Sequence, residues 1–412
     1  MPPPAANHHP PRALLLLPPA PSPPTYAALK AAYNSCLFTV LRQLVRAPRR
    51  THGPVILDIA LPCPHLNGRL KSPRGPLYAA TQALVANLYK LICVIAAKDS
   101  IDTEDAEGVD ARIILVAYPR NDTLLQPSEA ETPEQEVQGP AIDLHALASS
   151  PRSWDTVFSV ESEEGEGVLR HFLSLAPAKR DVERVRGGIV QVTPPPAAPA
   201  EDDGAATNHA AVAVGGTFDH LHIGHKLLLT MFAFVLGRRS SAAEDQAPST
   251  LTIGITGDEL LKNKKHAEVL ESWDRRHQIV HEFLSSIVHF GEPDDKRIYS
   301  EEHNEPGPNG HAVHVYYPSN LTIKYVEIMD PFGPTITDES ISALVISKET
   351  RSGGKAVNVK RQEKGWGPLE VFEVDVLDAG EEEAVDETFQ SKLSSTEIRR
   401  NISERAKSRR DT

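Results

Sequence analysis

The sequence AAVAVGGTFDHLHIGH spans residues 210–225 and joins the pattern of a strand to the pattern of a helix. Its first residues form a short apolar run typical of a buried strand, and the run ends at Gly215 and Gly216. A helical pattern follows over residues 222–237. In doubly wound α/β sheets, ligands bind beyond the carboxyl ends of the strands, where the strand order reverses. We therefore expect the loop between this strand and this helix to contain the residues that bind the ligand and act on it.

Two histidines lie at the predicted start of that helix. His222 and His225 are three residues apart, so both side chains project from one face of the first turn. Gly224 between them lets a planar base or a phosphate approach the backbone. The free N–H groups and the positive dipole of a helix N-terminus favour an anion. This arrangement suits a nucleotide phosphate.

Two other interpretations of the loop explain less of it. A histidine is more often a packed or solvated residue, and two adjacent glycines more often form a plain turn. Zinc bound by His220, His222 and His225 is a second alternative. A phosphate site bracketed by glycines also accounts for the polar residues Thr217 and Asp219, which fall at the same junction. We therefore favour the phosphate site.

Length, charge and cysteine content limit what the whole chain can be. Its 412 residues are enough for two or three domains, each with its own core. The formal net charge of −13 argues against nucleic acid as a main partner. The three cysteines lack CxxC spacing, which favours a reducing compartment over a disulfide framework or a cysteine zinc site. No apolar run approaches the roughly 18 residues of a membrane span, so we expect a soluble, cytoplasmic protein without a membrane partner.

The composition divides the chain into four segments. Residues 1–24 are mostly Pro, Ala and His, a composition typical of a disordered tail. Residues 25–192 contain a strand, helix and strand pattern, which predicts a smaller α/β domain of unknown role. Residues 193–209 combine prolines with acidic and small residues, as interdomain linkers do. Residues 210–412 alternate strands with helices, which predicts a Rossmann-like, doubly wound parallel sheet.

Three segments further along the chain contain motifs that, together with the loop, point to one protein family. Residues 254–265 read GITGDELLKNKK, residues 345–354 read VISKETRSGG, and residues 393–399 read LSSTEIR. With the HIGH string of the loop, they resemble, in order, the motifs of the HxGH nucleotidyltransferase superfamily. One departure is Leu393, which replaces the usual Ile of the SSTxIR element. The resemblance extends over about half of the chain.

Within that superfamily, the sequence is similar to the eukaryotic type of phosphopantetheine adenylyltransferase, in its monofunctional, fungal-like form. The strings GGTFD and ETRSGG narrow the choice. HxGH and SSTxIR alone are shared with nicotinamide-mononucleotide adenylyltransferases and, more loosely, cytidylyltransferases. The dephospho-coenzyme A kinase domain of the animal bifunctional enzyme is not expected here. The resemblance also implies that the sheet of residues 210–412 is of the nucleotidyltransferase type.

The resemblance implies that AMP passes from ATP to 4′-phosphopantetheine, giving dephospho-coenzyme A and pyrophosphate in coenzyme A biosynthesis. His222 and His225 would donate hydrogen bonds to phosphate oxygens, and Thr217 would orient the attacking phosphate. Lys265, or else Lys262 or Lys264, would neutralise the charge of that phosphate, and the sequence does not decide among the three. Mg²⁺ would bridge oxygens of the triphosphate and need few protein ligands. The implied contacts of the bound substrates are Gly215, Gly216, Asp219, Gly224, Lys262, Lys264, Arg351, Ser394, Ser395, Thr396 and Arg399.

Several of these assignments have ordinary alternatives. The three lysines of residues 262–265 also suit a solvated face, and Arg351 suits a surface position. The hydroxyl run of residues 394–396 is also what plain helix capping requires. Asp219 either orients His225 or caps the helix.

Two other functions stay open at this point. In one, the acceptor is nicotinamide mononucleotide or another phosphorylated compound. In the other, residues 1–192 bind further enzymes of coenzyme A biosynthesis, and the chain acts as a scaffold. The second follows from the length of the chain, because the predicted chemistry needs only the C-terminal half.

Overall fold

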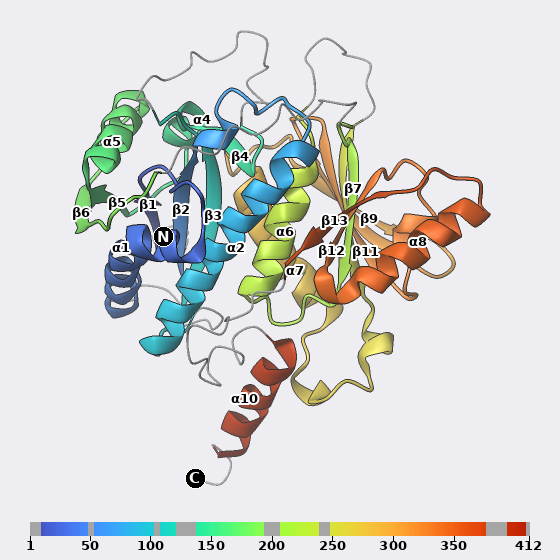
Figure 1. Cartoon of the computed structure of the whole chain (residues 1–412). Coiled ribbons are helices and arrows are strands. Elements are labelled where there is room, and N and C mark those ends of the chain that lie inside the picture. The colour runs from blue at the N-terminus through green and yellow to red at the C-terminus, as the bar shows by residue number, and fades with distance from the viewer. Residues whose placement is uncertain are drawn as a thin grey trace, which may run out of the picture.

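The computed structural model contains two β-sheets, one from each half of the chain, with the helices α2 (Gly75–Lys98) and α6 (Ile223–Val235) between them (Figure 1). It describes residues 10–47, 53–102, 108–120, 137–192, 207–238, 248–375 and 394–408. The α/β class predicted from the sequence is confirmed in both halves.

The first sheet consists of six parallel strands in the order β4-β3-β2-β1-β5-β6. Its central strands are buried along almost their whole length, as expected when the connections between parallel strands cover both faces. The strands are β1 (Arg12–Leu16), β2 (Val55–Cys63), β3 (Val109–Ala117), β4 (Ala141–Asp143), β5 (Thr156–Glu161) and β6 (Val182–Arg186). The remaining helical elements are α1 (Tyr26–Arg46), η1 (Pro64–Leu66), α4 (Leu144–Ser149) and α5 (Glu163–Leu175).

The prediction of a disordered tail over residues 1–24 is wrong for its described part, residues 10–24. Strand β1 pairs with β2 on one side and with β5 on the other, so it lies near the middle of the sheet. Residues 14–17 are leucines, and all four are fully buried. Five residues are enough for a strand that is enclosed by neighbours, although the flanking prolines resemble a disordered segment in composition. Residues 1–9 lie outside the described residues.

Helix α2 is long and apolar enough to cross a membrane, although no run of this kind was expected from the sequence. In the structure, 72% of its most apolar window is buried inside the protein. It packs against α1 and α6, and Leu84, Leu88 and Ile92 are among its buried residues. The apolar surface of α2 is therefore part of the protein core.

The second sheet has seven strands in the order β13-β12-β7-β8-β11-β10-β9. Five neighbouring strands, from β13 to β11, are parallel, in agreement with the predicted Rossmann-like arrangement. The strands are β7 (Ala211–Gly216), β8 (Ser249–Thr256), β9 (Tyr299–Asn304), β10 (His311–Tyr317), β11 (Leu321–Ile328), β12 (Ala343–Ser347) and β13 (Glu370–Val374). The helical elements are η2 (Asp258–Leu261), η3 (Ala267–Val269), α7 (Trp273–Val288), η4 (Gly333–Ile336), η5 (Lys348–Thr350), α8 (Arg351–Glu363) and α10 (Ser395–Ser408).

The second sheet is mixed rather than wholly parallel, which corrects the prediction. Strands β9 and β10 form an antiparallel edge next to β11. Only residues 318–320 separate β10 from β11, and a parallel pair requires a crossover of about a dozen residues or more. The sequence analysis predicted a parallel sheet from the alternation of strands and helices and did not take this short connection into account.

The strand order of the second sheet reverses at β7. This strand pairs with β8 on one side and with β12 on the other. The chain passes from β7 through α6 to β8, and it returns later to β12. The carboxyl end of β7 is therefore the position at which an open α/β sheet binds its ligand.

Helix α6 connects the two halves through a shared core. All residues from 226 to 235 are buried, and one continuous apolar cluster contains side chains of both halves, such as Leu88, Ile113, Phe232 and Ile253. Figure 1 shows α6 lying between α2 on the side of the first sheet and the strands of the second sheet. The two halves thus pack as one body around this helix.

The predicted linker is described only at its end. Residues 193–206 lie outside the described residues. His209 is buried, and its ring nitrogens contact Ser342 Oγ and Glu370 Oε2, each at 2.9 Å. The last residue of the predicted linker is therefore fixed at the base of the second sheet.

Candidate active site

His222 ends the loop after β7 and caps helix α6. Its backbone is extended, and its imidazole Nδ1 accepts a hydrogen bond of 3.1 Å from the N–H of Gly224. A side chain at position 224 would crowd the His222 ring, because an added Cβ would lie 3.1 Å from its Cε1 atom. With Nδ1 used as an acceptor, the proton of a neutral imidazole resides on Nε2. The cap therefore leaves His222 Nε2–H available as a donor.

The structure brings the two predicted histidines together. The rings of His222 and His225 stack with their centroids 3.9 Å apart and their planes at 21°. The ring of Phe218 lies 5.5 Å from that of His225. Among the described residues, the buried Nδ1 atom of His225 has no hydrogen-bond partner. A buried polar atom without a protein partner is able to bind a water molecule or a ligand group.

Both imidazoles are neutral near pH 7. Burial lowers the pKa of His225 to about 4, although the carboxylate of Asp219 opposes the shift. Burial also lowers the pKa of His222 well below its ordinary value, and the charges of His225 and Lys226 lower it further. A neutral imidazole can donate one N–H to a phosphate oxygen without first being protonated.

Asp219 has neither of the two roles considered from the sequence. Its buried carboxylate accepts 2.5 Å from Arg399 Nη1 through Oδ2, and 3.0 Å from the backbone N–H of Glu271 through Oδ1. No described hydrogen bond joins it to His225, and His222 takes the cap position of α6. Asp219 instead ties the loop to helix α10.

Arg399 forms hydrogen bonds within the protein, and its contact with a nucleotide stays a prediction. It is 3% exposed, and its remaining nitrogens donate to the Lys265 carbonyl at 3.0 Å and to Thr396 Oγ1 at 3.2 Å. Ser395 Oγ adds a hydrogen bond of 2.9 Å to the carbonyl of Asp219. Arg399 and Ser395 therefore fasten the start of α10 to the loop.

The lysines and the hydroxyl run lie around this junction. Lys262, Lys264 and Lys265 are exposed, and Lys262 forms an ion pair with Glu259. Helix α10 begins at Ser395, and the carbonyl of Ser394 accepts the first helical hydrogen bond from the N–H of Ile398, so Ser394 has the N-cap position. Ser394, Ser395 and Thr396 are partly exposed. The structure shows these groups near the loop but no contact between them and the histidine pair.

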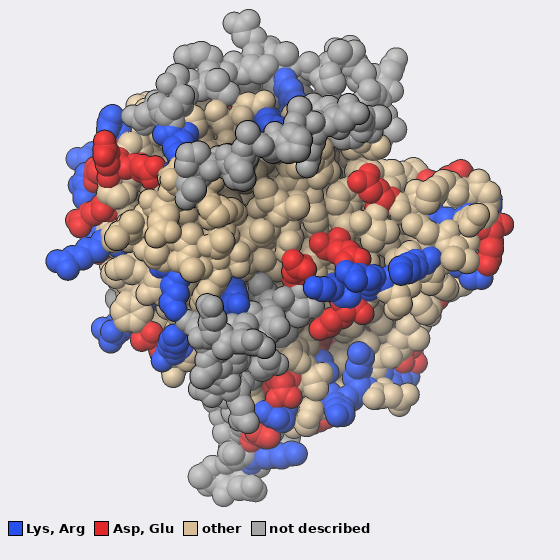
Figure 2. Space-filling view, in the orientation of Figure 1, with Lys and Arg blue, Asp and Glu red and all other residues tan. Residues whose placement is uncertain are grey.

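Arg351 lies outside this cluster. It is exposed at the start of α8, and its Nε donates 2.6 Å to Glu373 of β13. Figure 2 shows Lys and Arg side chains gathered along α8 with acidic side chains beside them. Arg351 therefore occupies the surface position that was its alternative interpretation.

His220 does not form a zinc site with the other two histidines. Its Nε2 lies 2.9 Å from the carbonyl of Val269, and its backbone N–H donates 2.8 Å to Glu271 Oε2. Within the part of the chain that the structure describes, no group of three histidine, cysteine or acidic side chains is placed to hold a metal ion.

Arg276 is a residue of the site that the sequence analysis missed. Its side chain is fully buried and donates to the carbonyls of Thr217 at 2.7 Å and Thr256 at 2.8 Å, and to Asp258 Oδ1 at 2.6 Å. It thus joins the loop after β7 to the end of β8. An arginine on the core-facing stripe of amphipathic helix α7, in line with Val280, was the available signal.

A cavity of about 410 Å³ lies on the face of the second sheet covered by η4 and α8. Gly216 is one of its lining residues, and an added Cβ there would lie 3.0 Å from the ring of Phe218. Apolar side chains make up most of its wall. Lining residues include Gly215, Gly216, Met329, Phe332, Leu344 and Ile346. The cavity therefore reaches the carboxyl end of β7, but His222 and His225 are not among its lining residues.

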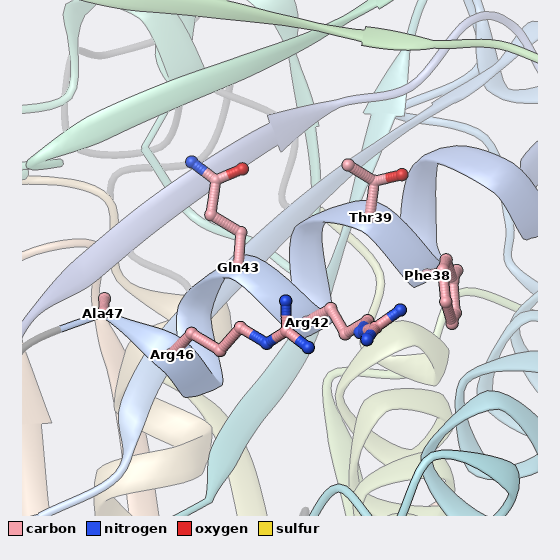
Figure 3. A pocket seen from close by; sticks show the side chains of 6 residues that line it. All are labelled: Phe38, Thr39, Arg42, Gln43, Arg46 and Ala47. Carbon is pink, nitrogen blue, oxygen red and sulfur yellow. The ribbon is translucent and has the colours of Figure 1, made fainter.

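Another hollow, of about 580 Å³, lies on the outer side of α1. Figure 3 shows Arg42 and Arg46 extending along one side of that helix, with Thr39 and Gln43 on the other side. Gln43 donates 2.7 Å to Glu183, and the guanidinium of Arg42 lies 5.4 Å from the ring of Phe38. This hollow contains none of the predicted site residues.

One family model and several curated relatives each match a part of this chain. Residues 1–191 match a family model described as a domain of unknown function (DUF8446). An uncharacterized protein of Schizosaccharomyces pombe is 32% identical over 263 residues, which are 63% of this chain and 69% of that protein. The phosphopantetheine adenylyltransferase of Saccharomyces cerevisiae is 37% identical over 195 residues, or 47% of this chain and 49% of that protein. That of Pyrococcus abyssi is 31% identical over 166 residues, or 40% of this chain and 78% of that protein.

Proposed function

Because the chain belongs to the family of the phosphopantetheine adenylyltransferases, we propose that it transfers AMP from ATP to 4′-phosphopantetheine and releases pyrophosphate. The matched segment spans about half of the budding yeast relative, at 49% of its length. The observation that carries the proposal is the stacked pair of neutral imidazoles at the carboxyl end of the central strand β7.

The chemistry is an in-line displacement at phosphorus. A phosphate oxygen of the acceptor forms a bond to the α-phosphorus of ATP, and the bond from that phosphorus to the pyrophosphate oxygen breaks. No covalent intermediate with the protein is required, so catalysis depends on positioning and on stabilising charge on the phosphate oxygens. His222 Nε2–H and the His225 ring would donate to those oxygens.

The backbone of the loop would assist the histidines. The positive end of the dipole of α6 favours the phosphate charge, although the N–H of Gly224 is already used by the His222 cap. Gly215 and Gly216 bring the backbone of β7 close to the same point without side chains. Thr217 follows them, and we assign it to the attacking phosphate, because Arg276 fixes its carbonyl.

The cavity beside Gly216 would take the arm of the acceptor. The pantetheine arm is a slender chain with a dimethyl group and two amides, and it needs an apolar channel with some polar groups. The cavity meets this need with apolar walls formed by Phe332, Leu344 and Ile346. Its volume of about 410 Å³ falls within the range of small-molecule sites.

The triphosphate would extend toward α10 and the lysines. Ser394, Ser395 and Thr396 lie at the N-terminus of a helix of 14 residues, which favours an anion. Arg399 ties the backbone of Lys265 to α10, so the lysine loop and this helix end stay together. We assign Lys265, with Lys262 and Lys264 beside it, to neutralising the phosphate charge.

Magnesium would enter as part of the Mg·ATP substrate. The carboxylates of Asp219 and Asp258 are both engaged by arginines, and that of Glu271 accepts from the His220 backbone. These side chains do not form a metal cage. The ion would neutralise charge on the triphosphate, which supplies oxygen ligands itself.

An acceptor comparison tests the proposal. Purified chain is given Mg·ATP with 4′-phosphopantetheine, nicotinamide mononucleotide or phosphoethanolamine, and pyrophosphate release is followed for each. We expect release with 4′-phosphopantetheine and little with the other two. Release that depends on nicotinamide mononucleotide, or none with any acceptor, would contradict the proposed substrate.

A further inference from the structure

Helix α6 contains one lysine, and this lysine is buried against the other half of the chain. Lys226 is 3% exposed, and its Nζ atom donates 2.7 Å to Asp110 Oδ1. Asp110 belongs to β3 of the first sheet, 116 residues away in sequence. Lys226 directly follows His225, so this ion pair joins the first sheet to the turn that carries the histidine pair.

Asp110 is held in place from its own side. Its Oδ2 atom accepts from Arg112 at 2.6 Å and 2.9 Å, which leaves Oδ1 for Lys226. Burial would raise the pKa of Asp110, but the charges of Arg112 and Lys226 together lower it. The carboxylate is therefore ionised and fixed, and the lysine that it holds cannot turn toward solvent.

We propose that Asp110 is a positioning residue, through which the first sheet fixes the first turn of α6 and hence the orientation of His222 and His225. The backbone N–H of Lys226 donates 3.0 Å to the carbonyl of His222, so the anchored residue also closes the turn that His222 begins. The proposal gives residues 10–192 a function in the transfer reaction, and it rests on the function proposed above.

The surrounding contacts fit a rigid support rather than a loose attachment. Helix α2 packs along α6 on the side opposite the second sheet. The next helix, α7, is held at its end, where Arg152 of the first half donates 2.7 Å to the His289 carbonyl and the N–H of Gly139 donates 2.7 Å to the Val288 carbonyl. The first half of the chain thus holds the end of α7 through two loop residues and the beginning of α6 through Asp110 of β3.

The alternative is that the ion pair only contributes to stability. Removing one partner of a buried pair leaves an uncompensated charge, which destabilises a protein whatever the pair does for function. A test therefore needs a readout that stability alone does not change. Local hydrogen exchange at residues 222–226 is such a readout, because it reports the opening of one turn and requires no substrate.

The experiment uses the full chain with Asp110→Asn, studied well below its unfolding temperature. We expect amide exchange in residues 222–226 to become about tenfold faster, and kcat for pyrophosphate release to fall about 10- to 100-fold with KM for ATP nearly unchanged, as misplacement of reacting groups predicts. The matched control is Tyr78→Phe, which removes a hydrogen bond of 3.1 Å between the halves, from Tyr78 Oη to the Glu373 carbonyl, and changes neither Asp110 nor Lys226. It should leave both values unchanged.

A second variant, Lys226→Met, separates anchoring from stability. It removes the contact between the halves but leaves Asp110 paired with Arg112, so no buried charge loses its partner and its unfolding temperature should fall less than that of Asp110→Asn. Anchoring predicts fast exchange at residues 222–226 and a low kcat in this variant as well, and this variant also decides the matter if Asp110→Asn does not fold. A wild-type kcat in Lys226→Met, or unchanged exchange in Asp110→Asn, would overturn the inference. A wild-type chain that releases no pyrophosphate would instead refute the proposed function and leave the exchange result valid.

Discussion

The two sheets of this chain differ most at the same topological position, the loop after the first strand of each. In the first sheet, β1 lies between β2 and β5, and the residues that follow it, 17–21, are buried. Tyr33 Oη donates 2.9 Å to the Pro18 carbonyl, and Arg120 donates to the Ala20 carbonyl. In the second sheet, β7 ends in two glycines and a partly exposed loop. One loop is filled with protein, and the other is open to a ligand.

The difference shows that the architecture alone does not make a binding site. Proline lacks a backbone N–H, so the segment after β1 cannot offer a phosphate the row of donors that a glycine-rich turn offers. Its carbonyls are also used within the protein. The first sheet is a parallel α/β sheet, as most of the second sheet is, but the segment after its strand β1 is part of its core.

The largest expected effect is the loss of catalysis when the open loop loses a histidine. His225→Ala removes one donor placed for the transition state, so we expect kcat to fall about 100- to 1000-fold with a smaller change in KM. Steady-state pyrophosphate release measures both values. His145→Ala, on helix α4 of the first sheet, is the matched control and should keep nearly full activity. An unchanged kcat in His225→Ala would contradict the catalytic role of the loop after β7, on which the comparison of the two loops depends.

The next effect concerns how the open loop is held. Asp219→Asn leaves the Arg399 guanidinium buried without its carboxylate, and breaking a buried pair of this kind costs about 3–5 kcal/mol. Urea unfolding of the full chain should show this loss of free energy. Glu164→Gln is the control. Glu164 forms an ion pair with Arg120, which also donates to the segment after β1, and the Arg120 side chain is about one quarter exposed. This ion pair should therefore contribute about 1 kcal/mol or less to the free energy of unfolding. Equal losses in the two variants would contradict the stronger anchoring of the open loop.

A third effect depends on pH. The pKa of His225 is about 4 in the folded chain and near 6.5 when unfolded, so the unfolded state takes up its proton first as pH falls. The free energy of unfolding should therefore decrease between about pH 6.5 and pH 4, by up to about 1.4 kcal/mol per pH unit for each such histidine. Thermal unfolding at several pH values measures this dependence. His225→Gln should weaken it, and a ring that titrates near pH 6.5 by NMR would contradict the neutral imidazole.

The parallel part of the second sheet and the histidine pair could be predicted from the sequence, because each follows from local patterns. The apolar run before Gly215 and the spacing of His222 and His225 involve residues within one strand and one turn. Strand β1 was missed because its five residues lie between prolines, and composition averages over a longer window. Local pattern and composition thus favoured opposite conclusions for residues 1–24.

The contacts that hold the site could not be predicted from local sequence patterns, because they join residues that are far apart in the sequence. Arg399 meets Asp219 across 180 residues, and Lys226 meets Asp110 across 116. One signal was available, since α6 is apolar on nearly every face after Lys226. A helix of that kind is buried on all sides, which predicts a second layer of protein over it. Only the structure shows that the first half of the chain forms this layer.

The smallest expected effect concerns the buried segment after β1, residues 17–21. Pro19→Ala removes a ring buried in the segment after β1 and gives the unfolded chain more freedom, so we expect a loss of about 1 kcal/mol in the free energy of unfolding. The kcat of the chain and its affinity for ATP, measured by titration calorimetry, should stay as in the wild type, because this segment serves the core of the first sheet. A weaker affinity for ATP in Pro19→Ala would mean that the first sheet also takes part in binding the nucleotide. The two loops would then have to be interpreted as two parts of one site rather than as an open and a filled version of the same position.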